Sequence, residues 1–290
     1  MNLFDVYKSF RSERDCHNYL IGLRWPDGIK CVYCQGDQIY HRSYGNGLKC
    51  RSCNNSFSVT IGTIFHASRL PLSKWFLAIA QILAAKKGIS SLQLARTIDV
   101  NKNTAWYMQQ RIRLAMGSDV LLSGIVEVDE TYIGGALGNM HRKKKLKRNP
   151  YKSGMIHKIP VLGMVERFSG SVNLKVLNHA DGLTIKPLLK QQITRESTLV
   201  TDGFGGYAGL DKHFNKHVKM NYDKGKRKEG IYNLSRINGF FTTIKRAVIG
   251  QYHRLTITHI QGYMDEIAFK KNTHPEVAFN LLLTKACAIK

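Results

Sequence analysis

The spacing of hydrophobic residues changes once along the chain, near Gly124. Before that point, residues 89–116 carry apolar side chains at helical spacing on either side of a break at 99–101. The break combines an aspartate with an asparagine that can cap a helix, so the pattern predicts a helix, a short turn and a second helix over 104–116. A helix-turn-helix unit has this pattern, although an ordinary pair of packed helices has the same signature in a single sequence.

From Gly124 onward the pattern favours short strands separated by glycines and helices. The stretches GIVEVDE, KIPVLGMVER and SVNLKVLNH predict three consecutive strands, LTIKPLLKQQI predicts a helix, and STLVTDG and KHVKMN predict a fourth and a fifth strand. Three further helices are predicted over 234–248, 258–272 and 275–290. Consecutive strands followed by alternating helix and strand predict an α/β fold, with a mixed central sheet flanked by helices.

Four cysteines are arranged as two CxxC pairs, Cys31 with Cys34 and Cys50 with Cys53. Each pair can turn two thiolates to one side of a knuckle, and two knuckles can close a tetrahedral zinc site. Two disulfides are the alternative, which we disfavour because we expect no export of this chain. The pattern therefore predicts one structural Zn²⁺ ion held by all four cysteines.

The chain is strongly basic, with a formal net charge of +24 from 44 Lys and Arg against 20 Asp and Glu. This balance favours a polyanionic partner, and nucleic acid is the first candidate. An anionic membrane is the second, but the basic residues fall in loops such as 141–152 and not along an amphipathic helix. The sequence has no run of about 18 apolar residues, so we expect no membrane association and a cytoplasmic protein.

Two aspartates stand at the predicted ends of strands, Asp129 in the first strand and Asp202 in the fourth. If these strands are neighbours, the carboxylates meet, and paired carboxylates in a basic protein suit Mg²⁺. Two such ions can activate an attacking oxygen and stabilise a leaving one in phosphoryl transfer. The alternative for each aspartate is that it merely begins a turn, because glycines follow both. Glu127 should share a strand face with Asp129, one pleat further back, and Glu130 should point to the opposite face, so both rank below it.

Five stretches of the chain, in this order, resemble bacterial insertion-sequence transposases of the ISXO-like group. They are RWPDGIKCVYC, CRSCNNSFSVTIGTIFHASRLPLSKWF, VEVDETYIGG, TDGFGGY and INGFFTTIKRAVIGQYHRLTITHIQGYMDEIAFKKN. The resemblance implies a zinc-ribbon region over 1–65, a helical helix-turn-helix DNA-binding region over 66–118 and a DDE-type catalytic domain of the RNase H-like fold over 119–290. It also implies a DNA transposase, which cleaves element ends and transfers the 3′-hydroxyl to target DNA with Mg²⁺ or Mn²⁺.

The resemblance assigns catalytic roles to four residues. Asp129 and Asp202 match the first two metal ligands of the family. Asn238 stands where many members have a glutamate, and Lys245 matches a later lysine that would position phosphate. Seven residues are nearly two helical turns, so Asn238 and Lys245 should project from one face of the same helix.

Candidate DNA contacts lie in three places. The second helix of the helix-turn-helix would enter the major groove, while a lysine-rich loop and a later turn would contact phosphates. The residues are Lys102, Asn103, Tyr107 and Gln110 in the helix, Lys143, Lys144 and Lys145 in the loop, and Arg254 in the turn. A solvated loop without DNA contact is the alternative for the three loop lysines. Trp106, in the same predicted helix, is expected in the core.

The resemblance also implies partners and a place in the cell. The partners are double-stranded DNA, as terminal inverted repeats and as target, and further copies of the chain in a homodimer or larger assembly on that DNA. The place is the bacterial nucleoid. The main alternative is a DNA-binding protein without catalysis, either a decayed transposase or a repressor, because Asn238 is not an acid. A metal-dependent nuclease that cuts without joining is the second alternative.

Overall fold

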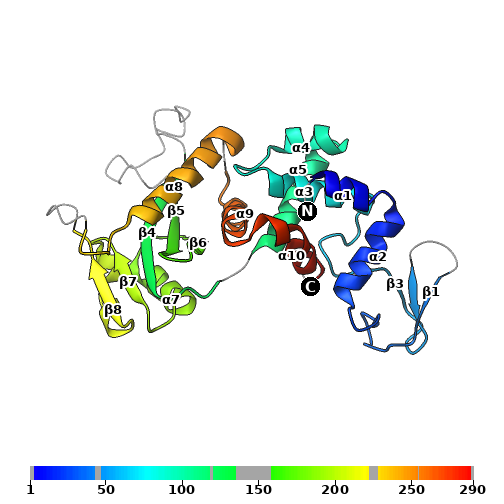
Figure 1. Ribbon diagram of the computed structural model, residues 1–290, viewed down its shortest axis with the longest axis horizontal. Helices are drawn as coiled ribbons and strands as arrows, with labels where there is room; N and C mark the ends of the chain where they lie inside the picture. Colours follow the sequence, from blue (N-terminus) through cyan, green and yellow to red (C-terminus); the bar gives the residue numbers. More distant parts are fainter. Residues whose placement is uncertain are drawn as a thin grey trace, which may run out of the picture. The chain divides into compact units, whose positions relative to one another are not determined.

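The computed structural model of the chain describes residues 3–42, 47–117, 120–134, 158–221, 228–253 and 255–288. The chain divides into two compact units, one formed by residues 1–117 with 273–290 and the other by residues 118–272. Figure 1 shows the elements of each unit, coloured along the chain. Within the described residues, no helix is long and apolar enough to cross a membrane.

The first unit combines a small antiparallel sheet with helices. The sheet has the order β1-β2-β3, with β1 Ile39–His41, β2 Leu48–Cys50 and β3 Ser56–Phe57. The helices are α1 Leu3–Ser9, α2 Glu13–Arg24, α3 Leu72–Ala84, α4 Ser91–Ile98, α5 Lys102–Met116 and α10 Pro275–Ala288.

Helix α10 packs within the first unit, although the sequence placed it in a catalytic region over 119–290. The ring of Phe279 on α10 lies 6.1 Å from that of Phe10 and 6.0 Å from that of Phe76, measured between centroids. Hydrophobic periodicity shows that a helix has an apolar face but not which core the face completes. The second unit therefore ends at residue 272 in the structure, while the other predicted boundaries stay predictions.

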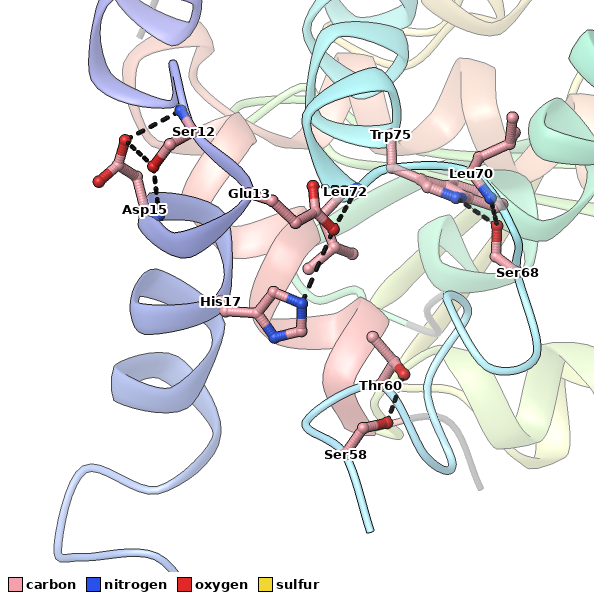
Figure 2. Close-up of polar contacts among 10 residues, drawn as sticks. All are labelled: Ser12, Glu13, Asp15, His17, Ser58, Thr60, Ser68, Leu70, Leu72 and Trp75. Carbon is pink, nitrogen blue, oxygen red and sulfur yellow. Dashed lines mark hydrogen bonds and ion pairs between the residues drawn. The ribbon is translucent and has the colours of Figure 1, made fainter. Parts of the chain in front are cut away.

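Helix α3 is capped by a residue from another helix. It begins at Leu72 after Pro71, which provides no side-chain cap. Both carboxylate oxygens of Glu13 on α2 accept a hydrogen bond from the Leu72 amide, at 2.9 and 2.8 Å, and His17 lies 3.7 Å from the same carboxylate (Figure 2). An acid at a helix N-terminus is favoured by the helix dipole. Helix α2 thus fixes the start of α3.

Helices α4 and α5 form the predicted helix, turn and second helix. Helix α4 ends at Ile98, and the next residue, Asp99, caps it with a left-handed backbone and a φ of 52°. The side chain of Asn101 then caps α5 by accepting a hydrogen bond from the Thr104 amide at 2.9 Å. Helix α5 therefore begins at Lys102, two residues before the predicted start.

The second unit is built on a five-stranded mixed sheet with the order β6-β5-β4-β7-β8. Its strands are β4 Ile125–Ile133, β5 Ile159–Glu166, β6 Val172–Val176, β7 Thr198–Thr201 and β8 Lys216–Lys219. Strands β4, β5 and β6 pair antiparallel, whereas β4 with β7 and β7 with β8 pair parallel. The mixed sheet predicted from the sequence is confirmed.

Helices cover both faces of this sheet (Figure 1). One face packs against α8 Ser235–Ala247 and α9 Ile260–Asn272, and the other against α7 Gly182–Gln192 and the short helix η2 Gly205–Tyr207. Val126 and Val128 of β4 belong to the core on the α7 face. Because side chains alternate along a strand, Glu127 and Asp129 point to the α8 face.

A glycine lets α8 lie close to the sheet beside Asp129. Gly163 on β5 is the register partner of Asp129 on β4. A Cβ atom at Gly163 would lie 2.6 Å from the Phe241 ring and 2.7 Å from the Ile237 side chain, both on α8. Since real Cβ contacts are not that short, the Phe241 ring and the Ile237 side chain would have to move to admit any other residue at this position.

Candidate active site and metal centre

The two predicted catalytic aspartates meet in the structure. Strands β4 and β7 run parallel, with Glu127 opposite Val200. Asp129 follows two residues later in β4, and Asp202 follows two residues later, just past the end of β7, so the same register brings them close enough for the charge of Asp202 to act on Asp129. The sheet therefore brings these two carboxylates together, as predicted.

The sequence predicted that Asp129 ends its strand, but in the structure Asp129 lies within the strand. Strand β4 continues to Ile133, because β5 pairs with it over its whole second half. Strand β7 ends at Thr201, and Asp202 begins a turn in which its Oδ1 accepts a hydrogen bond from the Phe204 amide at 2.9 Å. The turn alternative is thus excluded for Asp129, while Asp202 both begins a turn and faces Asp129.

The electrostatics of Asp129 show which charges lie near it. Burial raises the pKa of Asp129 to about 6, the Glu130 amide that donates to its Oδ1 at 2.8 Å lowers it, the charge of Asp202 raises it, and Lys245 lowers it. Two carboxylates that repel each other in a half-buried place favour a cation between them. Their hard oxygen ligands fit Mg²⁺ or Mn²⁺.

Glu130 points to the α7 face, as predicted. The sequence ranked it below Asp129 as a site residue, yet it lies close enough to Asp129 and Asp202 for their charges to act on it. Burial raises the pKa of Glu130 to about 7, the Tyr207 hydroxyl lowers it, and the charges of Asp129 and Asp202 raise it. Among the described residues, Glu130 Oε1 and the Tyr207 hydroxyl have no hydrogen-bond partner of normal geometry. They are near enough to interact, and no pattern in the sequence indicated that Tyr207 would lie there.

Helix α8 carries the other two candidates, Asn238 and Lys245. Both are exposed, and their spacing places them on one side of the helix. Lys245 is near enough to lower the pKa of Asp129. Asn238 lies in the first turn, where its amide donates to the Leu234 carbonyl at 3.1 Å.

Glu127, which the sequence ranked below Asp129, is fully buried on the α8 face. Its Oε2 accepts hydrogen bonds from the amides of Arg236 and Ile237 at the start of α8. Its Oε1 lies 3.2 Å from Nη2 of Arg167. Sequence reasoning missed these contacts, because nothing near Glu127 in the chain shows which helix begins beside it.

The four predicted zinc ligands come together in the first unit. The sulfur atoms of Cys31, Cys34, Cys50 and Cys53 all lie within 4.8 Å of one another, and none of the four is in a disulfide. Within the described part of the chain, no other group of three or more Cys, His, Asp or Glu side chains is as compact. The backbone amide of Cys53 lowers the pKa of Cys50 to about 6, which favours its thiolate. The four-cysteine prediction is confirmed, and the cluster indicates a structural zinc site.

The candidate DNA-contacting residues of α5 lie on its surface. Lys102, Asn103 and Tyr107 are exposed, and Gln110 is half-buried. Trp106 is 39% exposed on the same helix, so its prediction as a core residue was wrong. The remaining candidates, Lys143, Lys144, Lys145 and Arg254, lie outside the described residues.

Comparisons with known proteins find matches in both units. Residues 121–272 match the family described as the ISXO2-like transposase domain, a DDE domain of the RNase H-like fold, and residues 11–56 match the transposase zinc-ribbon domain. A relative from Halobacterium salinarum, described as an uncharacterized protein in transposable element ISH50, is 30% identical over 218 residues, which cover 71% of this chain and 72% of the relative. This relative is archaeal, so the likeness is not confined to bacteria.

A solved structure is also similar over part of the chain. It is the simian T-cell lymphotropic virus intasome in complex with PP2A regulatory subunit B56 gamma, which covers 59% of this chain and 58% of its own. The identity is 13% and the TM-score is 0.29.

Proposed function

The chain belongs to the ISXO2-like transposase family, and on this premise we propose that it cleaves the ends of its element and transfers the freed 3′-hydroxyl to target DNA. The observation that carries the proposal is the meeting of Asp129 and Asp202 on neighbouring parallel strands, with Lys245 beside them. This arrangement supplies anionic oxygens for cations and one cation for phosphate in the same place.

Each residue of the site has a distinct task in the proposal. Asp129 and Asp202 hold the metal ions through carboxylate oxygens, and Asn238 adds a neutral carbonyl oxygen. Lys245 holds a phosphate of the DNA strand against the carboxylates. Mg²⁺ or Mn²⁺, when bound, activates the attacking oxygen and stabilises the leaving one. A protein nucleophile is therefore unnecessary.

The first unit recognises the DNA in this proposal. The exposed face of α5, with Lys102, Asn103 and Tyr107, reads the terminal inverted repeats in the major groove, while the ribbon contacts the backbone. The net charge of +24 supports a polyanionic partner. Since both element ends must be cut together, the active form is a homodimer or larger assembly on DNA, in the cytoplasm at the nucleoid.

One observation favours a second function, a DNA-binding protein that has lost catalysis. Asn238 gives the site two acids and an amide, where three acids would bind divalent cations more strongly. A decayed transposase or a repressor would use the ribbon, α4 and α5 alone.

A strand-transfer assay separates these functions. Purified protein is incubated with Mg²⁺, supercoiled target DNA and a labelled fragment that carries the element's inverted repeat. Joined products support the transposase, nicks or breaks without joining support a nuclease, and bound but uncut DNA supports the binder. An Asp202→Asn variant that still yields joined products would place catalysis elsewhere.

A further inference from the structure

We propose that Glu127 is a positioning residue of the active site, because its buried carboxylate fixes the helix that carries Asn238 and Lys245 to the strand that carries Asp129. The inference rests on the proposed function, since it concerns the assembly of that same metal site. No metal ligand or DNA contact is assigned to Glu127 itself.

The residues just before helix α8 serve only its first amide, since Asn233 Oδ1 accepts a hydrogen bond from the Ser235 amide at 3.0 Å. The helix begins at Ser235, and the preceding Leu234 offers no side-chain oxygen to the free amides of the first turn. Glu127 Oε2 accepts hydrogen bonds from Arg236 at 2.9 Å and from Ile237 at 3.1 Å. These are the second and third helical residues, whose amides an N-cap side chain normally serves. Strand β4 thus provides the acceptor for the second and third amides of the helix, which its own flanking residues leave open.

The carboxylate lies in surroundings that would not tolerate it without these partners. Glu127 is 0% exposed, and its register partners on the two adjacent strands are Val165 and Val200. A buried charge is costly unless it is paired and hydrogen-bonded. Arg167, whose side chain is 12% exposed, lies 3.2 Å from Oε1 and balances the charge. The site is therefore built around an acid that reaches α8.

The cap bears directly on the metal site. Glu127 and Asp129 are two residues apart on one face of one strand, so they move together. Asn238 follows Ile237, the second amide that Glu127 holds. Any shift of the first turn of α8 consequently moves Asn238 relative to Asp129. One carboxylate thus sets the distance between the first and third proposed ligands.

Two substitutions of Glu127 separate the effect of its side-chain length from the effect of its charge. Glu127→Gln keeps the length of the side chain and an oxygen that accepts both amide hydrogen bonds, but loses the charge. Glu127→Asp keeps the charge but is one methylene shorter and cannot reach both amides. A positioning role predicts that Asp is the more damaging change, whereas a purely electrostatic role predicts that Gln is.

The test measures Mn²⁺ affinity of the full-length protein by electron paramagnetic resonance and hydrogen exchange of the α8 amides. For Glu127→Asp we expect faster exchange at residues 236–238 and a loss of Mn²⁺ affinity of about 10-fold or more, the range for partners that orient metal ligands. For Glu127→Gln we expect affinity within about threefold of the parent. Unchanged exchange in β5 and β6 shows that the sheet remains folded.

The outcomes also separate this inference from the proposed function. If the Mn²⁺ affinity of Glu127→Asp equals that of the parent, or if Gln weakens it more than Asp does, Glu127 does not position the site. If the parent binds no Mn²⁺, or if Asp129→Asn binds it as well as the parent, the proposed active site is itself wrong.

Discussion

The four-cysteine cluster and the pair of Asp129 and Asp202 are assembled in different ways. The cysteines lie between residues 31 and 53, and their sulfur atoms come from two short knuckles beside a three-stranded sheet of two- and three-residue strands. Asp129 and Asp202 are far apart in the chain and meet only because β4 pairs with β7 between two hydrophobic cores. Residues close together in the sequence form the cysteine cluster, whereas the pairing of distant strands forms the aspartate pair.

This difference teaches which centre depends on its metal for folding. A ribbon with so small a core needs the free energy of zinc binding to remain folded. The pair of Asp129 and Asp202 is supported by apolar residues on both faces of β4, so it should be in place before any cation binds. The comparison therefore predicts that metal removal unfolds one region and leaves the other intact.

The largest expected effect is that of Cys50→Ser. We expect loss of the zinc ion and loss of exchange protection over about residues 25–60, because apparent binding free energies of about 10–16 kcal/mol are coupled to folding in such sites. Metal analysis and hydrogen exchange measure both, with Cys287→Ala, a cysteine outside the cluster, as the control. One zinc per chain in Cys50→Ser, or protection that survives chelation, would contradict the prediction.

The next effect is that of Asp129→Asn and Asp202→Asn. Each should reduce cleavage below detection while DNA binding and the fold remain, because one anionic ligand of a hard cation is lost. Cleavage of a labelled inverted-repeat fragment measures this beside a gel-shift assay. Asp211→Asn changes an exposed aspartate of the same unit and should have no effect. Strand transfer retained by Asp129→Asn would show that the metal site is misplaced.

A smaller change in metal requirement is expected at Asn238. Asn238→Ala should lose cleavage, while Asn238→Glu should keep it and lower the half-maximal Mg²⁺ concentration on the order of tenfold, because ligand charge sets affinity. A Mg²⁺ titration of cleavage measures the shift, with Thr243→Ala on the same helix as the control. An active Asn238→Ala would exclude Asn238 as a ligand, and an inert parent with an active Asn238→Glu would identify a decayed copy.

The smallest effect concerns stability and pH. The pKa of Asp129 is raised to about 6 in the folded chain, above its ordinary value of 3.8, so the folded state binds the proton more tightly than the unfolded state. The resulting destabilisation is absent below about pH 4, grows as the pH rises to 6 and is complete above it. Metal-free Asp129→Asn should thus be more stable than the parent by about 3 kcal/mol at pH 8, with a smaller difference at pH 5.

Urea unfolding of the second unit at the two pH values checks this prediction. The zinc ribbon should show the opposite trend, since cysteine thiols must lose their protons to bind zinc and the stability of the ribbon therefore rises with pH. An equal gain for Asp129→Asn at pH 5 and pH 8 would show that the charge of Asp129 is not the cause.

The sequence predicted those features that depend on neighbours in the chain. The two CxxC pairs specify a four-ligand site by spacing, and alternation along β4 separates Asp129 from Glu130. The meeting of Asp129 with Asp202 followed from one topological assumption, that their strands are adjacent, which the sheet order bears out.

The features that the sequence did not predict depend on distant partners. Strand β4 extends past Asp129 because β5 pairs with it, and α10 joins the first unit because Phe279 contacts Phe10 and Phe76. The burial of Glu127 depends on where α8 begins. In each case the sequence around the residue would be the same whether or not the distant contact formed, so only the folded structure shows that contact.

The absence of a side chain at Gly163 has a consequence for how copies of this element should be judged when genomes are surveyed. A copy with Ala or Val at this position keeps every acid, the asparagine and the lysine, so an inspection of ligands alone would count it as competent. Yet the added methyl group would meet the Phe241 and Ile237 side chains of α8, the helix that carries Asn238 and Lys245, on the strand opposite Asp129. Such a copy should be assayed before it is counted as competent, on the ground of spacing and not of chemistry.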